Sequence, residues 1–184
     1  WDNKSSVLVG DYLFARSFQL MVETGSLRVL DILSNAAATI AEGEVLQLSA
    51  MSDLATAEET YLTIVRGKTA ALFSAATEVG GVIAGRPEEE VKALFDYGDA
   101  LGIAFQIVDD LLDLTGDQQT VGKTLGRDLE KGKLTLPLIH ELASAESHQR
   151  RELLALLRQA QDRAGQSEQA RARQIERIRD QVCR

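Results

Sequence analysis

Apolar residues recur at steps of three and four along almost the whole sequence, and only two prolines, Pro87 and Pro137, interrupt it. This period matches the helical turn of about 3.6 residues, whereas half-buried strands would show strict alternation. Because proline breaks a helix interior, so few prolines leave room for long helices. The sequence therefore predicts an all-α fold.

The expected helices begin and end at recognisable signals. Thr56, followed three residues later by Glu59, has the spacing of a capping box, which opens a helix. Gly85 closes that helix, and Pro87 suits the start of the next one. The expected helices span about residues 6–23, 26–48, 56–84, 87–114, 135–142, 149–164 and 168–182.

Composition excludes several classes of protein. Lys and Arg number 20 against 28 Asp and Glu, a net charge of −8, whereas a general nucleic-acid binder needs a basic surface. The single cysteine, Cys183, has no partner for an intrachain disulfide, which favours the reducing cytoplasm. No apolar run approaches the roughly 20 residues that span a bilayer. We expect residues 1–184 to form one all-helical domain, because this length suffices for a sizeable core.

Three aspartates, Asp109, Asp110 and Asp113, lie near the end of the helix expected at 87–114. Positions i and i+4 share a helix face and i+1 stands beside them, so three carboxylates would crowd one small surface. One interpretation is a solvated acidic face. Because residues 105–114 are otherwise mostly apolar, we instead expect the carboxylates to line a cavity. Hard oxygen ligands at this spacing suit Mg²⁺, which binds a few carboxylates together with substrate phosphates.

Lysines accompany the aspartates. Lys68 falls on an apolar stripe with Tyr61 and Val65, where a lysine either extends along the surface to solvent or projects its ammonium into the cavity of the aspartates. Lys123 and Lys133 lie in a glycine-containing loop after the aspartates, of a kind that closes over a bound anion. Carboxylates and lysines together indicate a metal-bridged diphosphate site.

With these motifs the sequence resembles the all-trans polyprenyl diphosphate synthases. The matching segments follow the family's order and are residues 10–13, 42–48, 68–70, 105–113 and 122–137. The Asp-Asp-x-x-Asp block, preceded by Phe105-Gln106, is the most specific of them. Residues 6–48 are more similar to the long-chain branch, which makes octaprenyl or decaprenyl diphosphate for quinone side chains, than to farnesyl synthases.

The resemblance implies a role for each matching residue. The ligands of Mg²⁺ at the allylic diphosphate would be Asp109 in particular, with Asp110 and Asp113. The lysines that hold this diphosphate would be Lys68, Lys123 and Lys133. The residues at the reacting centre would be Lys68, Thr69 and Gln106. The further pocket residues would be Gln47 and Phe105.

The resemblance also implies a fold, a reaction and partners. The fold is an isoprenoid-synthase-type helical bundle around a central cavity. In the family reaction, an allylic diphosphate ionises, the double bond of isopentenyl diphosphate attacks the carbocation, and a proton is lost. A homodimer is expected, in keeping with the apolar character of residues 6–48, and so is transient membrane contact when the oily product is released.

The family has a further Asp-Asp-x-x-Asp motif and a basic patch for isopentenyl diphosphate, both upstream of the matching segments. The 184 residues contain neither, and they begin at Trp1 rather than at a Met. In the family, a Trp-Asp-Asn-Lys-like stretch follows closely after the first motif. We therefore expect the fold to be incomplete at its N-terminus and these residues alone to be inactive.

Two other functions fit parts of the pattern. A non-catalytic subunit of a heteromeric synthase would lack the first aspartate motif, but it would have no need of the second. A class I terpene cyclase shares the helical fold and one aspartate-rich motif, and it adds a metal motif of Asn or Asp, Ser or Thr, and Glu. The nearest match, Asn35 with Thr39, would require an acid at Gly43.

Overall fold

The computed structural model describes residues 2–116, 126–161 and 168–182, and within them regular structure is helical throughout. The helices are α1 (Asn3–Glu23), α2 (Leu27–Ala50), α3 (Glu58–Val65), the π-helix η1 (Arg66–Ala70), α4 (Ala71–Ile83), α5 (Glu88–Thr115), α7 (Arg127–Glu130), α8 (Leu136–Ser144), α9 (Ser147–Gln161) and α10 (Glu168–Val182). The all-α prediction is confirmed.

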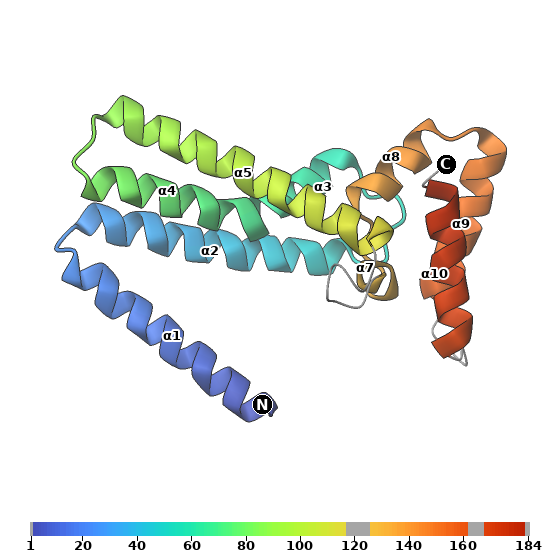
Figure 1. Ribbon diagram of the computed structural model, residues 1–184, viewed down its shortest axis with the longest axis horizontal. Helices are drawn as coiled ribbons and strands as arrows, with labels where there is room; N and C mark the ends of the chain where they lie inside the picture. Colours follow the sequence, from blue (N-terminus) through green and yellow to red (C-terminus); the bar gives the residue numbers. More distant parts are fainter. Residues whose placement is uncertain (1, 117–125, 162–167, 183–184) are drawn as a thin grey trace.

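Helices α2, α4 and α5 lie side by side as a layer, with α4 in the middle (Figure 1). Glycines allow this close packing. A Cβ placed on Gly98 would come 2.6 Å from Ser74 Cα, and one on Gly102 would come 2.5 Å from Ala70 Cα. Such distances are too short for any side chain, so α5 approaches α4 and η1 at these positions only because it carries glycine there.

The helix predicted over residues 56–84 is continuous along the chain through α3, η1 and α4, but it is not uniformly α-helical. It starts one residue later than the capping box predicts, because Ala57 is the N-cap and the Thr56 hydroxyl instead donates to the carbonyl of Asp53. The π-helical turn η1 then interrupts it at Arg66–Ala70. Such turns occur mostly as single bulges inside α-helices, frequently at functional sites, and their positions are not readable from apolar periodicity.

A second centre of packing lies at one end of the layer, where α8, α9 and α10 stand beyond the ends of α3 and α5 (Figure 1). Its buried side chains come from helices far apart in the sequence, including Val65 of α3, Leu138 of α8, Leu153 of α9 and Ile178 of α10. Gln174 of α10 is also buried, and its Nε2 donates to a backbone carbonyl of α9 at 3.0 Å. This cluster fixes the segment around residue 133 against the layer.

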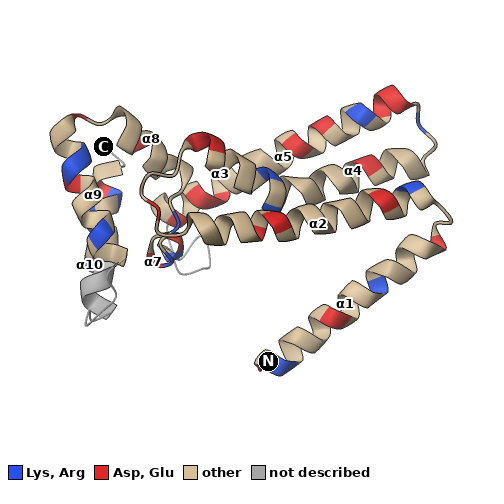
Figure 2. Cartoon of the chain, turned by 180° about the vertical axis from the view of Figure 1, so that it is seen from behind, with Lys and Arg blue, Asp and Glu red and all other residues tan. Residues whose placement is uncertain are grey.

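Helix α1 diverges from α2 after the turn at residues 24–26 (Figure 1). Figure 2 shows few charged residues along this helix. Its exposed large apolar residues are Val7, Leu8, Val9, Tyr12, Leu13, Phe14, Phe18, Leu20 and Val22. None of the helices described combines the length and apolar character needed to cross a bilayer.

Candidate functional site

A small cavity of about 50 Å³ opens where the C-terminal end of α2 meets α3, η1 and α5. Among its lining residues are five that the sequence analysis singled out: Gln47, Lys68, Thr69, Gln106 and Lys133. They come from four separate segments of the chain. Three of these segments are brought together because η1 packs against both α2 and α5, and Lys133 joins them from the turn before α8.

Lys68 lies in the π-helical turn and faces α2. Its Nζ is 3.0 Å from Glu44 Oε1 and donates a hydrogen bond of 3.2 Å to Gln47 Oε1. Lys68 lines the cavity, but its side chain is 33% exposed, so the ammonium lies at the border between cavity and solvent. Glu44, which the sequence analysis left out of the site, pairs with this ammonium but does not line the cavity.

Thr69 and Gln106 are joined across the boundary between η1 and α5. The Thr69 hydroxyl donates to Gln106 Oε1 at 2.8 Å, and Gln106 Nε2 donates to Asp110 Oδ1, also at 2.8 Å. Gln106 and Asp110 are four residues apart in α5, so they stack on one face of the helix. The amide therefore connects a hydroxyl at the cavity wall to a carboxylate in the interior.

Asp110 is the most enclosed member of the site, with 1% of its surface exposed. Its Oδ1 accepts from Gln106 Nε2 and from Lys133 Nζ, both at 2.8 Å, and its Oδ2 accepts from the Tyr61 hydroxyl at 2.8 Å. A buried carboxylate needs such donors, because an unpaired charge in the interior is strongly destabilising. Burial, and then the charge of Asp110, raises the pKa of Tyr61, so the phenol stays a donor.

Lys133 reaches Asp110 from a turn shaped by glycine. Gly126 and Gly132 both have left-handed backbone angles, with φ of 75°, and they bracket the short helix α7. Lys133 Nζ also donates to Asp128 Oδ2 at 3.2 Å. Burial opposes the charge of Lys133, but the carboxylates of Asp110 and Asp128 outweigh it and raise the pKa of the ammonium. Burial also opposes the charge of Asp128, which lies outside the predicted site, and in a carboxyl group this raises the pKa.

The other two aspartates of the motif differ from Asp110 and from each other. Asp113 is 7% exposed, and its Oδ2 accepts from the backbone N–H of Asp128 at 3.1 Å. The backbone carbonyl of Asp113 accepts from Gly126 N–H, so this residue ties the end of α5 to the turn that carries Lys133. Asp109 is half-buried. The three carboxylates therefore occupy three different environments.

Four of the apolar residues around the three aspartates are exposed. Phe105, Val108, Leu111 and Leu112 are between 40% and 56% exposed, whereas the carboxylates of Asp110 and Asp113 are inside. Helical geometry explains the inversion, because the face turned toward η1 and α7 carries the aspartates and their donors. Phe105 packs against Phe73, with ring centroids 5.4 Å apart, and does not line the cavity.

Two further predictions concern the metal and the loop. Among the residues that the structure describes, no three acidic, histidine or cysteine side chains converge as a ready-made metal site. Lys123, predicted to bind diphosphate, lies outside the described residues.

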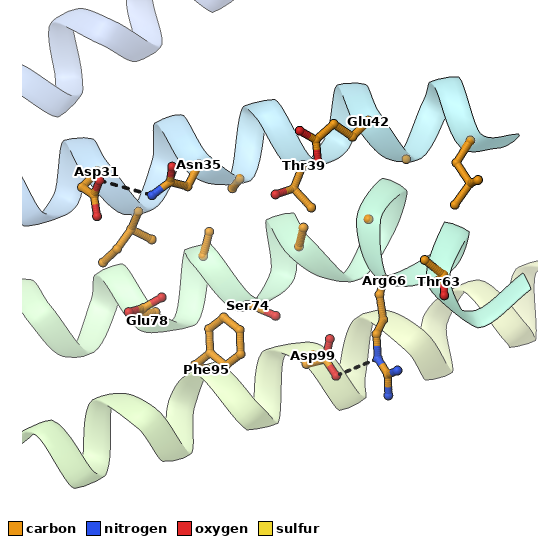
Figure 3. A pocket seen from close by; sticks show the side chains of 17 residues that line it. Asp31, Asn35, Thr39, Glu42, Thr63, Arg66, Ser74, Glu78, Phe95 and Asp99 are labelled. Carbon is orange, nitrogen blue, oxygen red and sulfur yellow. Dashed lines mark hydrogen bonds and ion pairs between the residues drawn. The ribbon is translucent and has the colours of Figure 1, made fainter. Parts of the chain in front are cut away.

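A larger hollow of about 640 Å³ lies along α2, α4 and α5 (Figure 3). The acidic side chains that line it include Asp31, Glu42 and Glu78. Two further lining residues form an ion pair, with Arg66 Nε 3.6 Å from Asp99 Oδ2 (Figure 3). None of the residues predicted to be functional lines this hollow.

The structure is similar to solved structures with the all-helical fold of isoprenoid synthases. A decaprenyl diphosphate synthase from Rhodobacter capsulatus matches with a TM-score of 0.82 and 57% identity, covering 99% of this chain and 54% of that one. A polyprenyl synthase from Caulobacter crescentus, complexed with calcium and isoprenyl diphosphate, matches with a TM-score of 0.88 and 44% identity, covering 100% of this chain and 53% of that one. The fold and the lysine–carboxylate cavity define an isoprenoid-synthase-type protein.

The family is more specific than the fold. Residues 1–174 match the polyprenyl synthetase family, and the chain belongs to it. The octaprenyl diphosphate synthase of Escherichia coli K12 is 51% identical over 140 residues, which are 76% of this chain and 43% of the relative. The chain thus spans about half the length of the relatives it matches.

Proposed function

We propose that the whole protein is a prenyltransferase that condenses an allylic isoprenoid diphosphate with isopentenyl diphosphate to give a long-chain all-trans polyprenyl diphosphate. The observation that carries this proposal is the gathering of Lys68, Thr69, Gln106 and Lys133 around one cavity whose floor is tied to Asp110. Two of the matched proteins are named as octaprenyl and decaprenyl synthases, which supports the long-chain product.

In this proposal the lysines bind the leaving diphosphate. Lys68 has three N–H donors, and two of them are engaged by Glu44 and Gln47. Lys133 likewise has one donor beyond those to Asp110 and Asp128. Each ammonium therefore keeps a donor for a phosphate oxygen while its position is held by protein oxygens. Lys123 is proposed as a third cation for the same diphosphate.

Mg²⁺ would supply positive charge that stabilises the departing diphosphate. The proposed ligands are the aspartates Asp109, Asp110 and Asp113. Asp109 is the best placed of them, because it is half-buried, whereas Asp110 and Asp113 are buried. One such carboxylate acting with diphosphate oxygens is the mode that Mg²⁺ commonly uses.

The remaining cavity residues suit a carbocation. Thr69 and Gln106 bring oxygen dipoles to the reacting centre without a nucleophilic charge. Ile64, Val65 and Met51 contribute an apolar wall, which keeps water from the cation. Gln47 is proposed as a further residue that lines the pocket. Phe105, which is exposed, is proposed to contact a substrate or a further segment of the whole protein.

The test is product analysis with the full-length protein. Farnesyl diphosphate, labelled isopentenyl diphosphate and Mg²⁺ should give long polyprenyl diphosphates, and omitting any of the three should abolish them. A Lys68→Gln variant should bind the allylic diphosphate more weakly. Cyclic hydrocarbon formed from farnesyl diphosphate alone would favour a terpene cyclase, and activity only after a second polypeptide is added would favour a heteromeric subunit.

Three further features belong to this proposal. The polypeptide of residues 1–184 by itself is expected to be inactive, because it carries only one Asp-Asp-x-x-Asp block. A cytoplasmic homodimer is proposed, in which the exposed apolar side chains of α1 are covered by the second copy. Contact with a membrane would be transient and confined to release of the product.

A further inference from the structure

We propose that Tyr61 is a positioning residue: through Asp110 it sets the direction of the hydrogen bond between Gln106 and Thr69, so that the Thr69 oxygen faces the reacting centre as an acceptor. This inference rests on the proposed prenyl transfer. It concerns a tyrosine that lies on the apolar stripe of Lys68 and that sequence alone reads as core.

The argument starts with the Asp110 carboxylate. Its two oxygens face different partners, because Oδ2 accepts from the Tyr61 hydroxyl and Oδ1 accepts from Gln106 and Lys133. The phenol thus fixes the rotation of the carboxylate about its last bond. Phenylalanine would fill the same space, but it would leave one buried, charged oxygen without its donor.

A fixed, ionised carboxylate also fixes the amide of Gln106. The amide has one donor end and one acceptor end, and only the donor end is stable against Asp110. Its oxygen therefore faces Thr69, whose hydroxyl proton is committed to it at 2.8 Å. A hydroxyl has a single proton, so the Thr69 oxygen meets any further group in the cavity with its lone pairs.

That polarity matters for carbocation chemistry. An oxygen that presents lone pairs stabilises a nearby positive charge, whereas an O–H directed at the cation would oppose it. If Asp110 rotates, the amide is free to turn, and the Thr69 proton can point into the cavity. The Tyr61 side chain also lines this cavity, but its hydroxyl is connected to the Thr69 oxygen only through three hydrogen bonds, and it acts by holding this order.

The test uses the full-length enzyme with Tyr61→Phe, and with Tyr97→Phe as the matched control on an exposed side chain. Tyr61→Phe should lower kcat about tenfold, as expected for one lost hydrogen bond to a charged group. The KM for the allylic diphosphate should change less than about twofold, because the lysines remain in place. Tyr97→Phe should leave both parameters unchanged.

A double-mutant cycle separates positioning from simple destabilisation. In a Gln106→Leu background the order of hydrogen bonds is already broken, so Tyr61→Phe should cause no further loss of kcat. A core residue that only stabilises the fold would reduce active enzyme by the same factor in both backgrounds. Equal losses in both backgrounds, or a kcat unaffected by Tyr61→Phe, would overturn the proposal.

Thermal unfolding of the same four proteins supplies a readout that does not depend on activity. If the wild-type protein transfers no prenyl group, the proposed function fails. The unfolding cycle then still decides whether Tyr61 and Gln106 are coupled through Asp110. The Tm losses of Tyr61→Phe and Gln106→Leu should then be non-additive, because both residues act on Asp110. Additive losses would show that Tyr61 and Gln106 are independent.

Discussion

Gly43 of α2 lies so close to Lys68 that a Cβ on the glycine would come 2.7 Å from the Lys68 backbone nitrogen. The approach is mutual, because a Cβ placed on Gly67 of η1 would come 3.2 Å from the Gly43 Cα. This glycine contact lets α2 touch the π-helical turn backbone to backbone. It also sets how far the Lys68 side chain must reach to Glu44 and Gln47.

Gly43→Ala should therefore impair both folding and activity. The added methyl group meets backbone rather than a flexible side chain, so α2 and η1 must separate. We expect a loss of about 1 to 3 kcal/mol in the free energy of unfolding, as for other overpacked positions. Because Lys68 moves with η1, the KM for the allylic diphosphate should also rise. Urea unfolding and steady-state kinetics of the full-length protein measure the two effects.

Gly80→Ala is the matched control for this substitution. Gly80 lies in α4, and a Cβ there meets nothing within 4 Å. The change should be neutral or should stabilise the helix by about 0.5 to 1 kcal/mol, because alanine has the higher helix propensity. If Gly43→Ala behaved like Gly80→Ala, the glycine contact would not hold the two helices.

Lys133 gives a prediction about alkaline pH. The carboxylates of Asp110 and Asp128 raise the pKa of this lysine above its ordinary value of 10.5, despite the opposing effect of burial. Folding therefore favours the protonated ammonium, and its contribution is complete below about pH 10.5 and is lost as the pH rises through the folded-state pKa.

Lys133→Met isolates that contribution. At neutral pH the variant should unfold more easily by roughly 2 to 5 kcal/mol, because the buried Asp110 loses its ammonium partner. Above about pH 10.5 the wild type should lose its advantage and the two unfolding curves should converge. Urea denaturation at a series of pH values tests this, and a constant difference up to pH 12 would contradict the assignment.

Sequence alone predicted the helices well, because their period, caps and glycines are local signals. It also brought Lys68, Thr69 and Gln106 into one site, since the family resemblance supplied what spacing does not. The roles of Tyr61 and Asp128 escaped it. A tyrosine on an apolar stripe looks like core, and only the packing of α3 on α5 shows that its hydroxyl meets a carboxylate.

The three aspartates show a different limit. Their spacing correctly indicates that they are close together, but it does not indicate which donors surround each one. Asp110 is buried by Tyr61 and Lys133, which lie 49 and 23 residues away in the sequence. A pattern within α5 contains no information about such partners, so the carboxylates look equivalent until the helices are packed.

The exposed apolar side chains of α1 predict an effect on assembly. If this helix is covered in a dimer of the full-length protein, Leu13→Glu places a charge in the interface, where it should weaken association strongly. Sedimentation velocity should show a shift from dimer to monomer at micromolar concentration. Gln19→Glu adds the same charge at an exposed polar position of α1 and should not shift it. A monomeric wild type would refute the proposed dimer.

The last prediction distinguishes Asp109 from Asp110. Asp109→Asn keeps the volume and removes only the charge of a half-buried carboxylate, so the free energy of unfolding should change by less than about 0.5 kcal/mol. Because Asp109 is a proposed metal ligand at the leaving diphosphate, the same change should lower turnover about 100-fold or more. Activity should also require more Mg²⁺. Asp110→Asn should differ, because it weakens a buried pair with Lys133. It should reduce stability by roughly 2 kcal/mol or more and lower turnover, and it should raise the Mg²⁺ requirement less than Asp109→Asn does. Mg²⁺ titrations of activity, paired with urea unfolding of both variants, give the comparison. A Mg²⁺ requirement raised more in Asp110→Asn than in Asp109→Asn would contradict the leading role of Asp109, and normal turnover in Asp109→Asn at limiting Mg²⁺ would remove it from the proposed site.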